Sequence, residues 1–211
     1  MSIRPIYLFG SDVLREQAKP VQELTDGVVK LIVDLVDTMH KAGGIGLAAN
    51  QVGELHRVLV IDLAAVEEAL KEETEGEEKE KSPREEKTLI VINPEILRQE
   101  GAWKMEEGCL SIPEVRADVE RAETTRVRFR DGNFREVEMD AQGLLARVLL
   151  HELDHLNGVL FIDHLSAAQR AMLKPALRKI KKGEAETSYP VVGSTHATPA
   201  SHRRRASGVG V

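Results

Sequence analysis

The sequence lacks the features that place a chain in a membrane or in an oxidising compartment. It has no run of about 18 apolar residues, the length needed to cross a bilayer, and no leader in which basic residues precede an apolar segment. Its single cysteine, Cys109, cannot form an internal disulfide, which agrees with a reducing compartment. We therefore expect a cytoplasmic protein, and we predict neither a membrane nor DNA as its partner.

The net negative charge is concentrated in one stretch of the chain. The 211 residues are 42% hydrophobic and 30% charged, with a formal net charge of -6, which suits one globular domain with a sizeable core. Residues 67–87 hold ten Glu and five Lys or Arg, so the remainder is close to neutral and overall acidity says little about partners. We predict one domain over residues 1–183, a charged and mobile insertion at 64–87, and a disordered polar tail at 184–211.

Residues 151–155 spell His-Glu-Leu-Asp-His, the H-E-x-x-H pattern of metal-dependent hydrolases. The apolar periodicity of 142–156 predicts a helix, with Asp140 able to cap its start. Positions four apart share one face of a helix, so the two histidines can bind a single ion, and Glu152 is the candidate general base. The alternative is a half-buried helix that carries two histidines by chance, because the pattern fixes only three identities.

Two histidines need a third ligand. One class of zinc proteases supplies a histidine at the position that Phe161 occupies here, so we look for the ligand upstream. Cys109 is the only thiol; between a glycine and an apolar residue it is by default a small buried core group. Together with His151 and His155, however, it would make a tetrahedral site that keeps one position open for water, as catalytic sites require.

A glycine-rich stretch at 43–53 follows an amphipathic helix that we expect to begin at Thr25 or Asp26 and to end at Gly43-Gly44. The stretch is not a phosphate-binding loop, because it lacks the preceding strand and the Lys-Ser or Lys-Thr of that motif. Its small residues favour close approach of the backbone to a ligand, to which Gln51 would present an amide. A purely structural loop is the alternative.

The remaining segments predict the fold class. Strands are expected at 57–63, at 88–93 with a stop at Asn93-Pro94, at 103–106, and in a hairpin of 124–130 with 134–139; a short helix is expected at 11–18. Ser166 caps a last helix, and residues 166–183 hold six Lys or Arg and no acid. This charge indicates either a solvated face or a phosphate-rich partner. We predict an α+β fold with antiparallel sheets packed around a central helix that carries the H-E-x-x-H motif, and with a C-terminal helix.

Three blocks occur in order: residues 44–53 (GIGLAANQVG), 107–111 (EGCLS) and 151–155 (HELDH). In this order and at this spacing they resemble the peptide deformylase family, over about residues 3–182 without the charged insertion. The resemblance implies a metal-dependent hydrolase that removes the formyl group from the N-terminal formyl-methionine of newly synthesised polypeptides and releases formate.

The resemblance also implies roles for individual residues. Cys109, His151 and His155 would hold one divalent ion, Fe²⁺ in this family, with Zn²⁺, Ni²⁺ or Co²⁺ able to replace it. A bound divalent ion lowers the pKa of its water from about 16 towards about 7. Glu152 would be the acid and base, while the Gln51 amide and the Leu110 backbone N–H would bind the carbonyl oxygen. The positions implied to bind the substrate are Ile45, Gly46, Glu107, Leu144 and Val148.

Two positions depart from the family pattern. Leu150 stands before the first histidine where many members have Gln, and Arg147 occupies a turn of the helix that faces the pocket and is often apolar. Two other functions stay open: a zinc peptidase that cuts internal bonds, and a catalytically silent module that contacts the ribosome through the basic last helix. The missing histidine at Phe161 argues against the first, and the intact Glu152 and Gln51 argue against the second.

Overall fold

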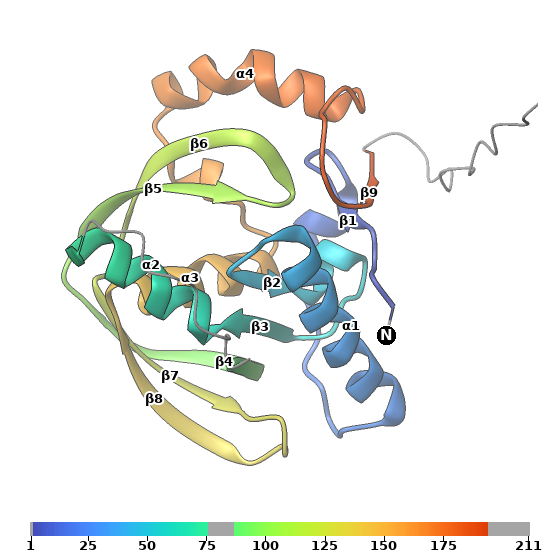
Figure 1. The fold of residues 1–211 in the computed structure, drawn as a ribbon, viewed down its shortest axis with the longest axis vertical. Coiled ribbons are helices and arrows are strands. Elements are labelled where there is room, and N and C mark those ends of the chain that lie inside the picture. The colour runs from blue at the N-terminus through green and yellow to red at the C-terminus, as the bar shows by residue number, and fades with distance from the viewer. Residues whose placement is uncertain (1, 76–86, 194–211) are drawn as a thin grey trace, which may run out of the picture.

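The computed structural model describes residues 2–75 and 87–193, without the side chains of 71–75. Figure 1 shows one helix over the top of the molecule, a curved sheet at the bottom and a hairpin between them. Residues 76–86 of the predicted mobile insertion and residues 194–211 of the predicted tail lie outside the described residues. No helix in residues 2–75 or 87–193 is both long and apolar enough to cross a membrane.

The main sheet has five antiparallel strands in the order β2-β3-β4-β7-β8. These strands are β2 (Gly46–Ala48), β3 (Val58–Asp62), β4 (Thr88–Glu100), β7 (Thr124–Arg130) and β8 (Glu136–Gln142). The predicted hairpin is confirmed as β7 and β8, whose alternating residues pair from Thr124 with Gln142 to Arg130 with Glu136.

Two smaller pairs of strands complete the sheets. Strands β5 (Trp103–Cys109) and β6 (Ile112–Arg121) form an antiparallel hairpin. Strands β1 (Ile6–Tyr7) and β9 (Val191–Val192) join the two ends of the described chain in a parallel pair. Antiparallel pairing therefore dominates, and with four α-helices the fold is of the α+β class.

The helices follow the expected patterns closely. They are α1 (Asp26–Ala42), α2 (Leu63–Glu75), α3 (Gly143–Leu156) and α4 (Ala167–Lys181), with short 3-10 turns η1 (Asp12–Arg15), η2 (Ala49–Val52) and η3 (Phe161–His164). Thr25 caps α1 by accepting a hydrogen bond from the N–H of Val28, and Gly43 ends it in the left-handed conformation that glycine adopts without strain. Ser166 caps α4 as predicted.

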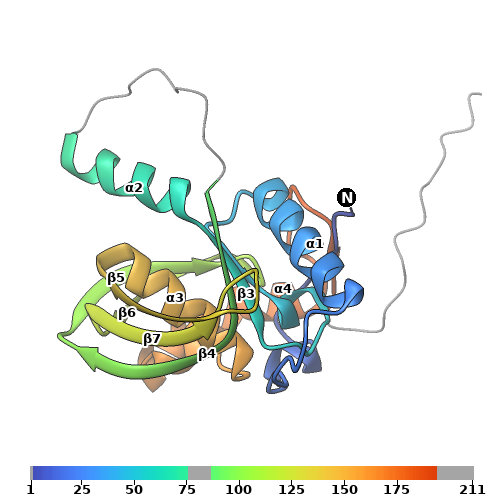
Figure 2. The same ribbon diagram turned by 90° about the horizontal axis from the view of Figure 1, so that it is seen from below.

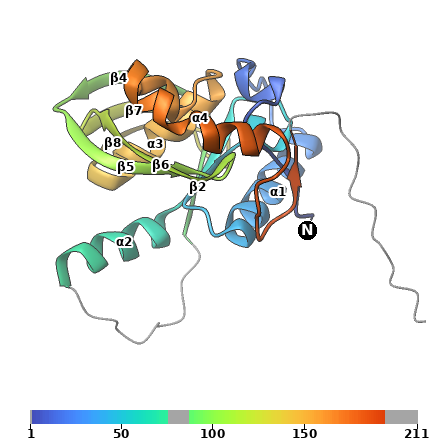
Figure 3. The ribbon, with the colours of Figure 1, turned by 90° about the horizontal axis from the view of Figure 1, so that it is seen from above.

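Strand β3 explains how the layers are held together. All five of its residues are buried, because α3 packs on one face of the sheet and α1 on the other. Leu59 and Ile61 join the α3 side with Leu149, while Val58 and Val60 join the α1 side. Successive residues of a strand point to opposite faces, so a continuous apolar run fits this position. Helix α4 covers β6 from outside (Figure 3).

Several local expectations were wrong. Strand β4 does not stop at Asn93-Pro94, because its pairing with β7 resumes at Glu95 after a bulge. At the bulge Asn93 takes a left-handed φ of 53°, and its side chain forms hydrogen bonds with the backbone of Val21. Asp140 does not cap α3 but lies in β8, and Gln142 stands at the cap without a side-chain hydrogen bond. In place of the helix expected at 11–18, the structure has only the 3-10 turn η1.

Two segments gain structure that we did not expect. Helix α2 occupies the first part of the predicted mobile insertion and projects from the body (Figure 2). Residues 184–193 had been assigned to the disordered tail, but they form a loop that leads into β9. The boundary of the catalytic domain at residue 183 stays a prediction, although the described chain continues past it.

Candidate metal centre and active site

Helix α3 carries the two histidines, and the end of β5 carries the cysteine. Cys109, His151 and His155 present ligand atoms that all lie within 4.8 Å of one another, the one such group of three found in residues 2–75 and 87–193. The Cys109 Sγ lies 3.1 Å from His155 Nε2. Cys109 lies 42 positions before His151 in the sequence, and the fold brings it beside the two histidines.

The donor chemistry of this cluster suits a metal ion. Two imidazoles and one thiol are ligands of borderline-soft divalent metals such as zinc and iron. Burial lowers the pKa of His155 well below its usual value, which favours the neutral imidazole that binds metal. Glu152 Oε2, next to this cluster, is one of the buried polar atoms that have no hydrogen-bond partner among the described residues. Buried polar atoms of this kind are costly, so the site fits an additional polar occupant.

Glu152 lies beside the cluster, 5% exposed. Burial is the largest influence on its carboxyl group and raises the pKa to about 7, against the lowering effect of His151 and Arg121. Gly46 makes room for this carboxylate, because a Cβ atom at residue 46 would meet Glu152 Oε1 at 2.7 Å. The glycine-rich stretch therefore approaches a side chain of the site, where the sequence had indicated a ligand.

Gln51 is buried and faces Cys109 across the site. Its Oε1 accepts a hydrogen bond from the N–H of Ala48 at 2.8 Å, which fixes the amide so that Nε2 points to the turn between β5 and β6. There Nε2 lies 3.2 Å from the Ser111 hydroxyl and 3.6 Å from Cys109 Sγ. The amide donor is thus held next to Leu110, the other residue expected to bind a carbonyl oxygen.

A network of buried charges supports His151 from behind. Glu107 is 6% exposed and accepts from His151 Nδ1 at 2.9 Å, from Arg121 Nε at 2.6 Å and from Arg147 at 2.6 Å. Burial tends to raise the pKa of Glu107, but the hydrogen bonds from His151 and Arg121 outweigh it and hold the pKa well below its usual range. Arg121 also donates to Asp154 at 2.7 Å.

This network changes the interpretation of two predicted positions. Arg147 adjoins the pocket, as expected, but its guanidinium turns to Glu107, to the carbonyl oxygens of Val119 and Trp103, and to the Trp103 ring. Glu107 likewise borders the pocket while its carboxylate is fully engaged by Arg121, Arg147 and His151.

One pocket contains nearly all of the predicted site. It is lined by every residue expected at the site except His155, which is buried beneath it. The wall also includes residues that sequence reasoning missed, namely Ala69 of α2 and the segment Glu186, Thr187, Ser188 and Tyr189 before β9. A signal for Ala69 was available, since Leu63, Val66 and Ala69 lie at helical spacing within the charged stretch. No local pattern marked 186–189.

The α+β fold, the H-E-x-x-H helix and the cysteine in a deep pocket define a class, the metal-dependent hydrolases. Comparison with known proteins narrows the class. The family model of polypeptide deformylase matches residues 3–171. The peptide deformylase of Salinibacter ruber is 47% identical over 191 residues, which are 90% of this chain and 94% of the relative. The peptide deformylase of Chlorobaculum parvum is 39% identical over 189 residues, which are also 90% of this chain and 94% of the relative.

Solved structures of peptide deformylases have the same fold as this chain. The peptide deformylase of Legionella pneumophila aligns with a TM-score of 0.72 and 38% identity, covering 88% of this chain and 99% of that one. That of Ehrlichia chaffeensis in complex with actinonin aligns with a TM-score of 0.72 and 36% identity, covering 88% and 100%. The chain therefore belongs to the polypeptide deformylase family, hydrolases that remove the N-formyl group from nascent polypeptides.

Proposed function

We propose that this chain deformylates nascent polypeptides with one divalent metal ion held by Cys109, His151 and His155, and that this ion is Fe²⁺, with Zn²⁺, Ni²⁺ or Co²⁺ able to replace it. The observation that carries the proposal is the convergence of these three ligand atoms within 4.8 Å, beside a pocket that Cys109 and His151 line. When bound, such an ion supplies Lewis-acid activation of water and of the carbonyl group near neutral pH.

Glu152 is the proposed acid and base. A pKa raised to about 7 by burial lets the carboxylate take a proton from the attacking water and later return it to the departing amine at neutral pH. The absence of a side chain at Gly46 leaves room for this carboxylate. Because its Oε2 has no partner within the described residues, the proton transfer does not have to break an existing hydrogen bond.

Gln51 Nε2 and the Leu110 N–H are the proposed donors to the formyl oxygen, on which negative charge grows as the carbonyl carbon is attacked. Both donors are fixed in advance, Gln51 by Ala48 and Leu110 by its place in the β5–β6 turn. The other proposed contacts of the substrate come from pocket residues around its methionine, namely Ile45, Gly46, Glu107, Leu144 and Val148. For Glu107 the bonds to His151, Arg121 and Arg147 favour a supporting role at the edge of the pocket.

Formate release from a formyl-methionyl tripeptide tests the proposal. Protein loaded anaerobically with Fe²⁺ or Ni²⁺ should release formate rapidly, and Glu152→Ala should abolish release while keeping one ion per chain. The same peptide without its formyl group should not be cut, whereas a zinc peptidase would cut it. Absence of formate from protein shown to hold one ion would contradict the proposal and favour the silent binding module.

Replacement of the amide donor tests its role separately. Gln51→Leu should lower turnover about 100- to 1000-fold, the usual effect of removing one such donor, and should leave the metal content unchanged. Gln99→Leu, at an exposed position of β4, is the matched control. A normal rate in Gln51→Leu, or a loss of metal that accounts for its lower rate, would contradict the role of Gln51.

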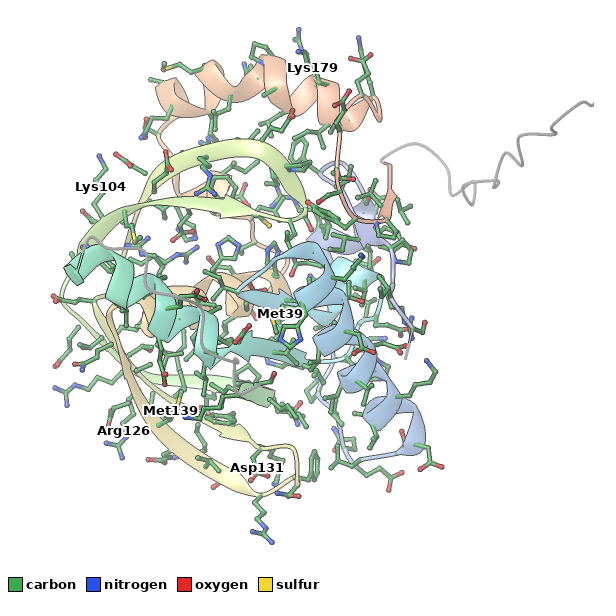
Figure 4. All side chains as sticks on the ribbon, in the orientation of Figure 1. Met39, Lys104, Arg126, Asp131, Met139 and Lys179 are labelled. Atoms are coloured by element: carbon green, nitrogen blue, oxygen red, sulfur yellow. The ribbon has the colours of Figure 1, made fainter. Side chains whose placement is uncertain are left out.

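A ribosome contact through α4, in the cytoplasm where polypeptides are made, is a further part of the proposal. The basic residues of this helix are all exposed, and Lys179 lies on the outer side of the molecule (Figure 4). They are Arg170, Lys174, Arg178, Lys179, Lys181 and Lys182. If these charges dock on phosphates, co-sedimentation with ribosomes should be strong at low salt and should weaken steeply as salt rises. Binding that does not depend on salt, or no binding at low salt, would exclude this docking.

A further inference from the structure

The chain that follows α4 returns to the active site and lies against its proposed oxyanion donor. Residues 186–189, which we call the C-terminal strap, line the pocket together with Cys109 and Leu110. The Tyr189 hydroxyl donates a hydrogen bond of 2.8 Å to the carbonyl oxygen of Leu110. The strap therefore contacts the peptide that joins Leu110 to Ser111, directly beyond the Leu110 N–H.

The strap is anchored at both of its ends. Before it, the N–H of Glu184 bonds the carbonyl of Lys179 at the end of α4. After it, the N–H of Ile6 bonds the carbonyl of Pro190 at 2.9 Å, and β9 pairs with β1. Within it, the Thr187 hydroxyl donates to the carbonyl of Tyr189 at 2.8 Å. Tyr189 is thus held by neighbours on each side of the sequence.

The turn itself is braced from several directions. Its strands close at the pair Cys109 and Ile112, so Leu110 and Ser111 form a tight two-residue connection. The N–H of Phe9 donates to the carbonyl of Ser111 at 2.8 Å. Gln51 Nε2 reaches the Ser111 hydroxyl. Tyr189 supplies the corresponding contact at Leu110, so the carbonyl groups of both turn residues are bound by segments from the two ends of the chain.

We infer that Tyr189 is a positioning residue for deformylation: its hydrogen bond fixes the carbonyl of Leu110, and through the shared Cα atom this keeps the Leu110 N–H, in the preceding peptide unit, directed at the formyl oxygen; this inference rests on the proposed function of Leu110. The ring of Tyr189 is half-buried and packs with Leu110 against the core on the α1 side. Burial, assisted by the charge of Cys109, raises the pKa of Tyr189 to about 12. The hydroxyl therefore stays protonated and keeps donating throughout the neutral range.

Tyr189→Phe removes only the hydroxyl and tests the inference in the full-length, metal-loaded protein. A misdirected donor weakens the transition state more than substrate binding, so we expect kcat to fall about tenfold with KM within about twofold. Metal content and the urea midpoint should be unchanged. Tyr7→Phe is the matched control, because the chain's other tyrosine lies against Gly53 of the neighbouring loop, and it should leave kcat unchanged.

Amide hydrogen exchange supplies a readout that does not depend on activity. Exchange at the Leu110 and Ser111 amides should be faster in Tyr189→Phe than in the parent and in Tyr7→Phe. Unchanged exchange at these amides would overturn the inference, and so would an unchanged kcat where the parent is active. A fall in kcat would also overturn it if metal loss accounts for the fall or if Tyr7→Phe shows the same fall. If the parent releases no formate but Tyr189→Phe speeds exchange, Tyr189 does stabilise the turn at Leu110, and it is the proposed function of Leu110 that fails.

Discussion

Two groups of Arg and Glu residues in this molecule have similar composition and opposite surroundings. Behind His151, Glu107, Arg121 and Arg147 form a buried network whose side chains are only 4–5% exposed. On the outer face of β7 and β8, Arg126 and Arg128 pair with Glu138 in an exposed ladder whose side chains are 37–46% exposed. Figure 4 shows Arg126 at the outer edge of the sheet.

The difference shows what burial does to an ion pair. In the network, each charge has lost its hydration, so every remaining hydrogen bond is needed to offset that loss. In the ladder, water replaces any lost partner, and the pairs contribute little. We therefore expect changes in the network to affect stability and metal binding together, and changes in the ladder to affect neither.

Glu107→Gln should have the largest effect. It keeps the shape of the side chain but leaves Arg147 as a buried cation without a carboxylate and Arg121 with Asp154 as its remaining carboxylate. Breaking a buried pair in this way typically costs about 3–5 kcal/mol. The bond that orients His151 is also weakened, so metal affinity should fall about 10- to 100-fold, as for other changes to partners of metal-binding histidines. Urea unfolding and competition with a chelator measure the two effects.

Glu106→Gln is the control for this change. Glu106 is the preceding residue of β5, but its side chain is 59% exposed and its partner Arg116 lies 3.6 Å away at the surface. It should change neither the urea midpoint nor the metal affinity. Equal effects of Glu106→Gln and Glu107→Gln would show that the burial of the network has no special consequence.

Arg147→Met should have the second largest effect. It removes one of the two cations from Glu107, which keeps both of its bonds to Arg121. It also strips a donor from the carbonyls of Val119 and Trp103. Buried acceptors without a donor cost about 1–3 kcal/mol, so the loss of stability should lie in that range in urea unfolding. Arg116→Met at the surface is the control, and a gain of stability in Arg147→Met would contradict the prediction.

Asp34 tests the comparison away from the metal site. Burial tends to raise the pKa of its carboxyl group, but hydrogen bonds from Lys30 and Arg4 outweigh burial and lower it. A lowered pKa in the folded state stabilises the fold above the unfolded value of about 3.9 and loses that contribution as the pH falls further. Asp34→Asn should therefore be less stable than the parent at pH 7, and the two unfolding curves should converge below about pH 4. A gap at pH 3 as large as that at pH 7 would contradict this.

The sequence predicted those parts of the molecule that depend on local sequence patterns. Helix α1 follows from its apolar period and its cap at Thr25, and three sequence blocks indicated the cluster of Cys109, His151 and His155. The buried network was not predictable in this way, because Glu107 and Arg147 are 40 residues apart and neither segment indicates that the two side chains meet. The same holds for Tyr189, whose bond to Leu110 spans 79 residues. Such contacts depend on how the layers pack, and local periodicity does not encode that packing.

The exposed ladder should show the smallest effect, and this prediction sharpens the comparison most. Glu138 accepts from Arg126 at 3.1 Å and from Arg128 at 2.9 Å, and these hydrogen bonds lower its pKa. These hydrogen bonds are of ordinary length, although longer than the 2.6 Å bonds of the network, and exposure is the larger difference between the two groups. Glu138→Gln should leave the urea midpoint unchanged at pH 7, at both low and high salt, since solvent and salt already screen these charges. If it destabilised the protein as much as Arg147→Met, geometry and not burial would set the strength of both groups.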